Sequence, residues 1–231
     1  MVNPEKKTVL ITGISSGIGR QLVACFLEND YNVIGISRSK QSLSFTYDSL
    51  YNHLVFDWED FHSLTERIEI LLDDSRIDFL INNAGMLKKQ PASELVKDDF
   101  TESFYINSIA PFLLIQSLKS RVLFVEKAHI VQISSIAGIQ GALKFPELLT
   151  YGASKAALIA ITESLQSEWG DSLTFNALAL GAVETEMFRS AFFNASAPIS
   201  DVQMAIWIFK FTVNSGEIMA GQVVKVKKLD P

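Results

Sequence analysis

Short runs of β-branched and other apolar residues alternate with longer helical patterns along almost the whole chain, and this alternation restricts the fold more than any other feature. Strands that alternate with helices are typical of βαβ units, whose parallel strands form one sheet with helices on its faces. The runs that predict strands are residues 8–12, 32–37, 53–56, 79–82, 129–134, 174–179 and 223–227. The helical patterns cover residues 17–29, 61–73, 98–125, 150–169 and 201–213, with a bend expected at Pro111. We therefore expect an α/β fold with a doubly wound parallel sheet of about seven strands and helices on both faces.

The chain has the size and composition of one globular domain. It has 231 residues, of which 48% are hydrophobic, and no repeat, low-complexity tract or Pro/Gly-rich linker interrupts it. We expect residues 1–231 to form a single domain. The start of the chain lacks the apolar core of a signal peptide, and no apolar stretch reaches the roughly 18 residues of a membrane span. A cytoplasmic protein without a membrane partner is expected.

Charge and metal-ligating residues exclude several classes of function. The net charge is -6 and no basic run is present, which argues against nucleic acid and anionic membranes as partners. His53, His62 and His129 are scattered and lack cysteine companions, so no metal site is expected. The single cysteine, Cys25, cannot form an internal disulfide.

A glycine loop follows the first predicted strand. Gly13, Gly17 and Gly19 lie between this strand and the first predicted helix, in the order that a dinucleotide site requires. Glycine lets the backbone approach a pyrophosphate, and the N–H groups and dipole of the helix N-terminus favour its negative charge. The spacing is G-x-x-x-G-x-G rather than the commoner G-x-G-x-x-G. The loop predicts a cofactor site, with a purely structural turn as the other interpretation.

The same segment, Gly13-Ile14-Ser15-Ser16-Gly17, also matches the G-x-S-x-G nucleophile elbow of serine hydrolases. Such an elbow normally follows a strand in the middle of the sheet, with an acid and a histidine at later strand ends. Here the loop follows the first strand, and the last histidine, His129, begins a predicted strand. The hydrolase remains the less favoured alternative.

Tyr151 and Lys155 lie four residues apart at the start of the fourth predicted helix. This spacing places both side chains on one helix face. A free tyrosine has a pKa of about 10, and a fixed neighbouring cation lowers it toward the range suited to general acid or base work. The same spacing also occurs on solvated helix faces, so the meaning of the pair depends on the motifs around it.

Five motifs in this order resemble the short-chain dehydrogenase/reductase family, in its compact one-domain branch. They are the glycine loop, Asn82-Asn83-Ala84-Gly85, Asn107, Ser134-Ser135-Ile136-Ala137-Gly138 and Tyr151-x-x-x-Lys155. The resemblance covers about residues 8–227 and implies a Rossmann-type sheet and an NAD(P)-dependent oxidoreductase acting on carbonyl or secondary alcohol groups.

The resemblance assigns catalytic roles to four residues. Tyr151 would protonate the carbonyl oxygen in reduction, or act as the base in alcohol oxidation. Lys155 would lower the pKa of Tyr151 and hold the nicotinamide ribose. Ser135, rather than Ser134, would bind the substrate oxygen, since adjacent residues of a strand end point to opposite faces. Asn107 would hold a water that connects Lys155 to solvent.

The resemblance also assigns residues to the cofactor. Asp57 and Trp58 lie where family members contact the adenine ring. The backbone of Val183 and the hydroxyl of Thr185 would contact the carboxamide group of the nicotinamide. Leu180-Gly181 stands where the family usually has Pro-Gly. The full set expected to bind cofactor is Gly13, Ser15, Ser16, Gly17, Ile18, Gly19, Ser37, Arg38, Asp57, Trp58, Asn83, Ala84, Gly85, Tyr151, Lys155, Val183 and Thr185.

The end of the second strand predicts which cofactor is used. An acidic residue there accepts the ribose hydroxyls of NAD, whereas an arginine accommodates the extra phosphate of NADP. This strand ends with Ser37 and Arg38, without a carboxylate. Serine donates to a phosphate, and arginine forms a charge-assisted fork with it. We therefore expect NADP(H), with NAD(H) as the second option.

The substrate pocket and the assembly are less defined by the sequence. A small-molecule carbonyl or alcohol is expected between residues 86–87, 143–148 and 186–196. Met187, Phe188, Phe192 and Phe193 would form either an apolar lid or the core face of a short helix. Similar proteins pair the helices around Asn107 and Tyr151 into homodimers, often tetramers. The family's glycine-rich ending is replaced here by residues 225–231, which favours the dimer. A cofactor-binding regulator of the same fold, without turnover, is the alternative to the enzyme.

Overall fold

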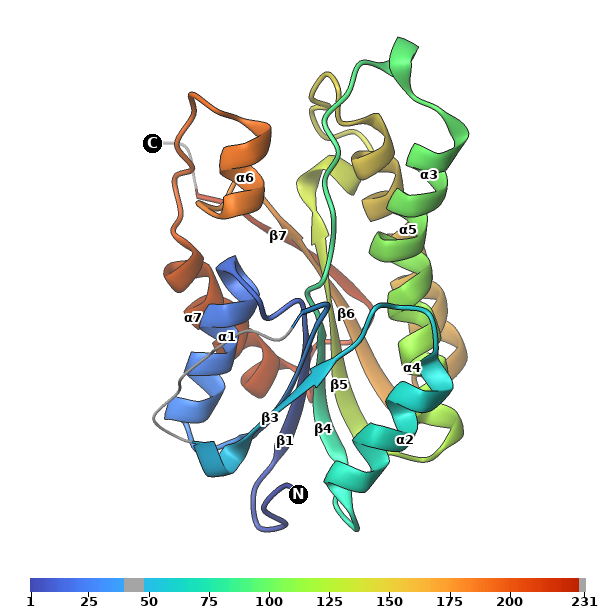
Figure 1. Ribbon diagram of the computed structural model, residues 1–231, viewed down its shortest axis with the longest axis vertical. Helices are drawn as coiled ribbons and strands as arrows, with labels where there is room; N and C mark the ends of the chain where they lie inside the picture. The colour runs from blue at the N-terminus through green and yellow to red at the C-terminus, as the bar shows by residue number, and fades with distance from the viewer. Residues whose placement is uncertain (40–47, 229–231) are drawn as a thin grey trace.

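The computed structural model describes residues 1–39 and 48–228 (Figure 1). Its sheet has seven parallel strands in the order β3-β2-β1-β4-β5-β6-β7. The strands are β1 (Thr8–Thr12), β2 (Asn32–Ser37), β3 (Tyr51–Val55), β4 (Ile77–Asn82), β5 (Phe124–Ser135), β6 (Leu173–Leu180) and β7 (Gln222–Val226). The described α-helices are α1 (Gly17–Glu28), α2 (Phe61–Leu72), α3 (Lys97–Phe104), α4 (Ala110–Ser120), α5 (Leu149–Trp169), α6 (Glu186–Ala191) and α7 (Asp201–Ser215). The expected doubly wound fold, including its strand number, is confirmed.

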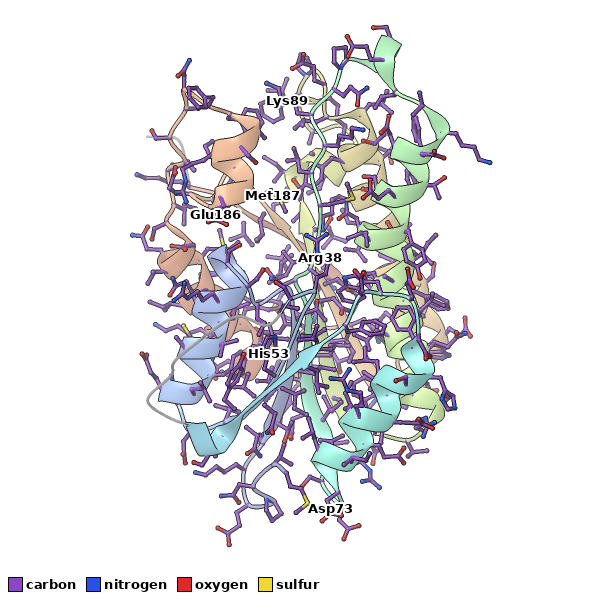
Figure 2. All side chains as sticks on the ribbon, in the orientation of Figure 1. Arg38, His53, Asp73, Lys89, Glu186 and Met187 are labelled. Carbon is purple, nitrogen blue, oxygen red and sulfur yellow. The ribbon has the colours of Figure 1, made fainter. Side chains whose placement is uncertain are left out.

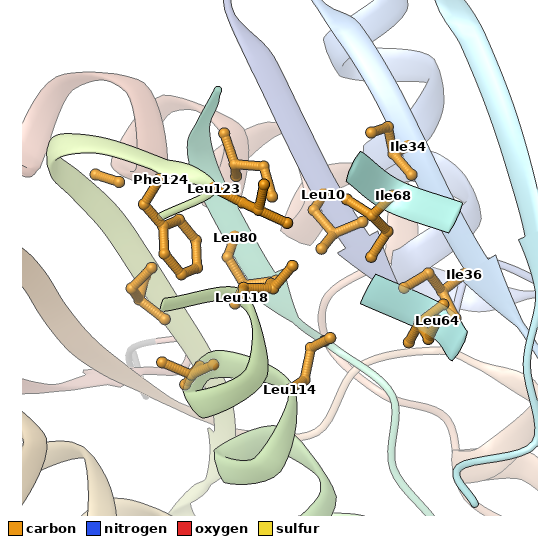
Figure 3. Close-up of a cluster of buried hydrophobic side chains, with 14 of the residues drawn as sticks. Leu10, Ile34, Ile36, Leu64, Ile68, Leu80, Leu114, Leu118, Leu123 and Phe124 are labelled. Atoms are coloured by element: carbon orange, nitrogen blue, oxygen red, sulfur yellow. The ribbon is translucent and has the colours of Figure 1, made fainter. Parts of the chain in front are cut away.

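Helices cover both faces of the sheet because successive strand residues point to opposite sides. Leu10 of β1 packs with Leu64 of α2 and Leu114 of α4 on one face (Figure 3). Val9 and Ile11 of the same strand belong to the cluster on the other face, which is covered by α1 and α7. In Figure 1 these two helices lie on the left of the sheet and α2, α4 and α5 on the right. The near-continuous apolar runs of the strands follow from burial on both faces.

The strand order has a topological switch point between β1 and β4. From β1 it moves outward to β2 and β3, then returns to place β4 on the other side of β1. The loops after these two strands therefore separate and leave a crevice at their carboxyl ends, which is where ligands bind in open α/β sheets. The fold thus places the glycine loop and the segment after β4 at the same crevice.

The single helix predicted over residues 98–125 is wrong. The segment forms α3, a five-residue π-helical turn, η3 (Tyr105–Ile109), and then α4, which ends at Ser120. The N–H of Ala110 donates to the carbonyl of Tyr105, five residues back. Pro111 has no N–H to donate, and its ring crowds the carbonyl four residues earlier, that of Asn107. The irregularity therefore lies directly before Pro111, and Asn107 lies inside it.

Other element boundaries also differ from the predictions. β5 begins at Phe124 rather than at residue 129, with a shift of its register against β4 between Ile77 and Phe79. Three short 3₁₀ turns, η1 (Asp48–Leu50), η2 (Ala92–Glu94) and η4 (Ile136–Gly138), were not predicted, and α6 lies where the sequence left a short helix as one of two interpretations. Residues 229–231 of the unusual C-terminal ending lie outside the described residues. Within the described part of the chain, no helix combines the length and apolar character needed to cross a membrane.

His129 of β5 links this strand to β6 and to α7. It is only 2% exposed. Its Nδ1 donates to the carbonyl of Thr212 at 2.9 Å, and its Nε2 accepts from the Asn176 amide at 2.9 Å. Both ring nitrogens are therefore used by the neutral imidazole, and burial lowers the pKa of His129 below its ordinary value of 6.5.

This burial predicts a loss of stability in mild acid. Below about pH 6.5 the unfolded chain takes up a proton on His129 that the folded chain does not, so the free energy of unfolding falls as pH falls. One proton contributes at most about 1.4 kcal/mol per pH unit. Urea unfolding between about pH 7.5 and 5.5 measures the slope, and His129→Gln should flatten it. An unchanged slope in the variant would assign the acid sensitivity to other groups.

Candidate active site

A cavity of about 1050 Å³ lies in the crevice at the carboxyl ends of the strands. It extends from Arg38, past the glycine loop, to Tyr151 and the helix α6. Every residue predicted to bind cofactor or to act in catalysis lines it, except Asn107. Parallel strands end at the same edge of a sheet, so residues distant in sequence meet at this one cavity.

The glycine loop makes its tight turn between β1 and α1 by close backbone contact. A Cβ atom on Gly19 would lie 2.1 Å from the carbonyl oxygen of Gly13, which no side chain tolerates. The loop therefore packs against itself and presents the N-terminus of α1, beginning at Gly17, to the cavity. Unpaired N–H groups and the positive end of the helix dipole suit a pyrophosphate at this place.

Asn83, directly after β4, fixes the glycine loop. Its side-chain amide donates to the carbonyls of Thr12 and Gly13, both at 3.0 Å. The N–H groups of Asn83 and Ala84 donate to the Thr12 hydroxyl at 3.1 and 3.0 Å. The ends of β1 and β4 are therefore locked together across the crevice. This bonding explains physically why an Asn-Ala pair follows β4.

The end of β2 forms one end of the cavity. The Ser37 hydroxyl donates to the carbonyl of Ser39 at 2.8 Å, and its oxygen lies 2.7 Å from Nε2 of His53 on β3. The Arg38 side chain is exposed, and Figure 2 places its label in the centre of the molecule, above His53. Sequence reasoning did not single out His53, because its contact with Ser37 depends on the pairing of β2 with β3.

Asp57 and Trp58 follow β3 and reach the same part of the cavity. Trp58 is 5% exposed, and its ring packs edge-on against Phe56. The phenol of Tyr105, in the π-helical turn, donates to the carbonyl of Trp58 at 2.7 Å. The indole thus belongs mainly to the core, so only part of it faces the cavity.

At the other end of the cavity, Ser135 ends β5 and faces α5, which carries Tyr151 and Lys155. Burial raises the pKa of the Tyr151 phenol, while its hydrogen bond with Ser135 acts in the opposite direction. The expected lowering by Lys155 is not found in this structure. Burial lowers the pKa of Lys155 itself to about 8, and its Nζ donates to the carbonyl of Ile133 at 2.8 Å.

The two serines at the end of β5 have different partners. The Ser134 hydroxyl donates to the carbonyl of Lys155 at 2.9 Å and so fastens α5 to the sheet. The Ser135 oxygen accepts from the N–H of Ala137 at 3.2 Å, in the η4 turn. Gly138 ends this turn, and a Cβ there would lie 2.6 Å from the backbone of Lys155. The close approach of α5 to the turn thus sets the distance between Ser135 and the Tyr151-Lys155 pair.

Asn107 is completely buried and does not line the cavity. Its Oδ1 accepts from the N–H of Met86 at 2.8 Å, and its Nδ2 donates to the Met86 carbonyl and to Ser154 Oγ, both at 2.9 Å. A Cβ on Gly85 would lie 3.1 Å from Asn107 Oδ1 and 3.2 Å from Lys155 Nζ. The Asn107 side chain therefore holds the segment after β4 against α5, beside the ammonium group of Lys155.

The helix α6 closes one side of the cavity. Thr185 begins it, and the Thr185 hydroxyl accepts from the N–H of Phe188 at 3.2 Å. The sequence predicted either a lid or a core role for four apolar residues of this segment. Three of them, Met187, Phe188 and Phe192, line the cavity. Phe193 is 92% exposed and lines neither cavity nor core. The short helix thus exists, and its apolar residues form a cavity wall.

In residues 1–39 and 48–228, the cavity has neither a histidine that could act as a hydrolase base nor a cluster of metal ligands. No histidine in these ranges lines it, and no cluster of three or more His, Cys, Asp or Glu side chains gathers there or elsewhere in them. Ser15 in the loop therefore has no imidazole partner in the cavity. The site geometry supports dinucleotide chemistry rather than the hydrolase alternative.

This arrangement defines a dinucleotide-binding α/β protein with a tyrosine and a lysine beside the cofactor crevice. The sequence model for "short chain dehydrogenase" matches residues 7–195, and the chain belongs to this family. It is accordingly an oxidoreductase of the kind that interconverts alcohol and carbonyl groups.

The similar proteins have low sequence identity to this chain, but the similarity covers most of it. The 3-oxoacyl-[acyl-carrier-protein] reductase of Rickettsia prowazekii is 30% identical over 188 residues, which are 81% of this chain and 77% of that protein. The 2-dehydro-3-deoxy-D-gluconate 5-dehydrogenase of Bacillus subtilis is 27% identical over 186 residues, 78% of this chain and 72% of that protein. The solved structure of ElxO with NADP bound is similar over 96% of this chain and 97% of that chain, with 27% identity and a TM-score of 0.82.

Proposed function

We propose that the protein is an NADP(H)-dependent oxidoreductase that transfers hydride between nicotinamide and a carbonyl or secondary alcohol, with Tyr151 as general acid or base. One observation carries this proposal. Ser135, Tyr151 and Lys155 gather at one end of a cavity whose middle is formed by the glycine loop. When bound, the reduced cofactor supplies hydride, so the protein must deliver a proton to the substrate oxygen.

Tyr151 suits the role of proton donor in reduction. Because burial raises the pKa of its phenol, the proton stays on the oxygen at neutral pH until a substrate oxygen accepts it. The Ser135 hydroxyl, hydrogen-bonded to the phenol, is placed to bind the same substrate oxygen. Lys155, held at the Ile133 carbonyl, supplies a cation that stabilises the phenolate left behind. We assign Asn107 to holding the Met86 segment and to the proton path from Lys155 to solvent.

The residues along the cavity fit the parts of NADP(H). The glycine loop and the N-terminus of α1 would hold the pyrophosphate, and Ser37 with Arg38 the additional phosphate of the adenosine ribose. Asp57 and Trp58 would meet the adenine. The Asn83–Gly85 segment, Lys155 and Tyr151 would hold the nicotinamide ribose side, and Val183 and Thr185 the carboxamide. The NADP in the ElxO structure supports the same cofactor, with NAD(H) as the weaker option.

Arg38 provides a test of the cofactor proposal. Arg38→Ala removes a charge-assisted hydrogen bond worth roughly 1.5–3 kcal/mol, so the KM for NADPH should rise about 10- to 100-fold. The KM for NADH, which lacks this phosphate, should change little. Steady-state kinetics with both cofactors checks this, with Arg76→Ala in the loop before β4 as the matched control. Equal losses with both cofactors would contradict phosphate recognition by Arg38.

We further propose that residues 1–231 form one domain that works in the cytoplasm as a homodimer, on a small-molecule substrate and without nucleic acid or membrane. The outer surfaces of the helices beside the cavity support the dimer. Phe112 of α4 stacks on Trp169 of α5 with ring centroids 6.5 Å apart, and Ile109 and Leu149 are 42% and 47% exposed. Apolar side chains on two adjacent helices suit burial against a second copy.

A further inference from the structure

We propose that the substrate is an uncharged ketone, or the matching secondary alcohol, with an aromatic or alkyl substituent, and that a carboxylate on that substituent is rejected. This inference rests on the proposed function, because it concerns the part of the cavity beyond Tyr151. It follows from the walls of that part and from the charges that surround it.

The walls beyond Tyr151 are mainly hydrocarbon. Phe145 and Leu148 come from the loop between β5 and α5, Phe188 and Phe192 from α6 and the residue that follows it, and Met86 from the segment after β4. The rings of Phe188 and Phe192 lie 5.0 Å apart, and Phe192 meets Phe145 edge-on at 6.4 Å. Three adjacent rings form a surface on which a flat or alkyl substituent is buried favourably, at roughly 25 cal/mol per Å².

Beyond Tyr151 and Lys155, the charged side chains among the described residues that line this end of the cavity are carboxylates. Within the described ranges, the cations that line the whole cavity are Arg38, at the opposite end, and Lys155, whose Nζ is bonded to a backbone carbonyl. Glu102 of α3 and Glu186 of α6 both line the cavity, and the two helices lie on opposite sides of the upper end of the molecule in Figure 1. Neither forms an ion pair with any residue that the structure describes. A substrate carboxylate there would lose hydration and meet charges of its own sign.

Lysines near the mouth of the cavity are already engaged. Lys144 Nζ donates to the carbonyls of Ala137 and Ile139 at 2.6 and 2.7 Å. Lys89 Nζ lies 3.3 Å from a carboxylate oxygen of Glu147 and 5.4 Å from the centre of the Phe192 ring. In Figure 2, Lys89 is labelled at the upper end of the molecule, apart from Glu186 and Met187. Lys144 or Lys89 could therefore bind an entering carboxylate only by breaking a contact that it already makes.

Lys144 and Phe145 lie in the loop between Ser135 and Tyr151, which are 16 positions apart. Its fixed shape explains the apolar wall. Lys144 anchors the loop to the η4 turn, and the N–H of Gln90 donates to the carbonyl of Glu147 at 2.9 Å. The anchored loop therefore places Phe145 opposite Phe192. The charged groups of the same loop are already engaged, because Lys144 donates to backbone carbonyls and Glu147 pairs with Lys89.

The test compares three ketones that share a phenyl ketone and differ only in the far group. These are 4-oxo-4-phenylbutanoate, its methyl ester and the analogous trimethylammonium ketone. With the full chain and NADPH, kcat/KM for the ester should exceed that for the carboxylate about tenfold, which corresponds to about 1.4 kcal/mol of lost hydration and charge repulsion. A carboxylate turned over as well as the ester would overturn the proposal, and a preference for the trimethylammonium ketone would assign a cationic substrate instead.

Two further measurements keep the inference separate from the proposed activity. Calorimetric titration of each ketone into protein saturated with NADP⁺ gives the order of binding even without turnover. Ester binding tighter than carboxylate binding, with no oxidation of NADPH, would support the substrate class and contradict the reductase. Glu186→Gln should raise the carboxylate-to-ester ratio about fivefold or more, whereas Glu168→Gln at the exposed end of α5 should leave that ratio unchanged. No change with Glu186→Gln would contradict the electrostatic part of the inference.

Discussion

Tyr151→Phe is expected to lower kcat for carbonyl reduction by about 10²- to 10⁴-fold, the usual contribution of a positioned general acid. The ring stays in place beside Ser135, but the proton that the substrate oxygen needs is no longer available. Among the described residues that line the cavity, no other tyrosine is present, so no second phenol replaces it. Oxidation of NADPH at saturating ketone, followed by absorbance, measures the loss.

The NADPH affinity of this variant should stay close to that of the wild type, since a ring without its hydroxyl still fills the same space. Fluorescence titration with NADPH checks this. Tyr31→Phe removes a phenol from the aromatic cluster around Phe26 and Phe209, and serves as the matched control with unchanged kcat. If Tyr151→Phe kept wild-type turnover, another group would be the acid. If it lost NADPH binding as well, the main role of the Tyr151 hydroxyl would be to hold the cofactor rather than to donate a proton.

The sequence could predict the site well where a motif directly follows a strand. Gly13, Asn83 and Ser135 each come at the carboxyl end of a strand, and parallel strands bring those ends together. Only the order of the strands had to be right for these residues to meet at one cavity. This explains why residues predicted from local patterns line the same cavity as Tyr151 and Lys155.

Features that depend on tertiary contacts could not be read from the sequence. The π-helical turn around Asn107 has five residues, too few to show a period of their own within residues 98–125. The helix α6 has six residues, too few to show a period, and its apolar residues line a cavity. The raised pKa of Tyr151 reflects burial, which no local pattern of charges reveals.

Gly19→Ala is expected to weaken NADPH binding about 100-fold, and this is the largest effect we expect from a change outside the catalytic residues. The new methyl group would lie 2.1 Å from the Gly13 carbonyl oxygen and 2.5 Å from the Asn83 amide nitrogen. Neither can simply move, because the Asn83 amide holds the carbonyls of both Thr12 and Gly13. The loop must open, at a cost of roughly 1–3 kcal/mol, and the N–H groups that would face the pyrophosphate turn away.

Thermal unfolding and NADPH titration together separate damage to the loop from damage to the fold. The matched control is Gly141→Ala, in the turn after η4, where the backbone φ is +75° and nothing lies within 4 Å of an added Cβ. Alanine strains that turn by about 1 kcal/mol or more, so the control loses stability without touching the glycine loop. We expect NADPH affinity to fall only in Gly19→Ala. Wild-type affinity in that variant would mean that the contact between Gly19, Gly13 and Asn83 is not what shapes the cofactor site.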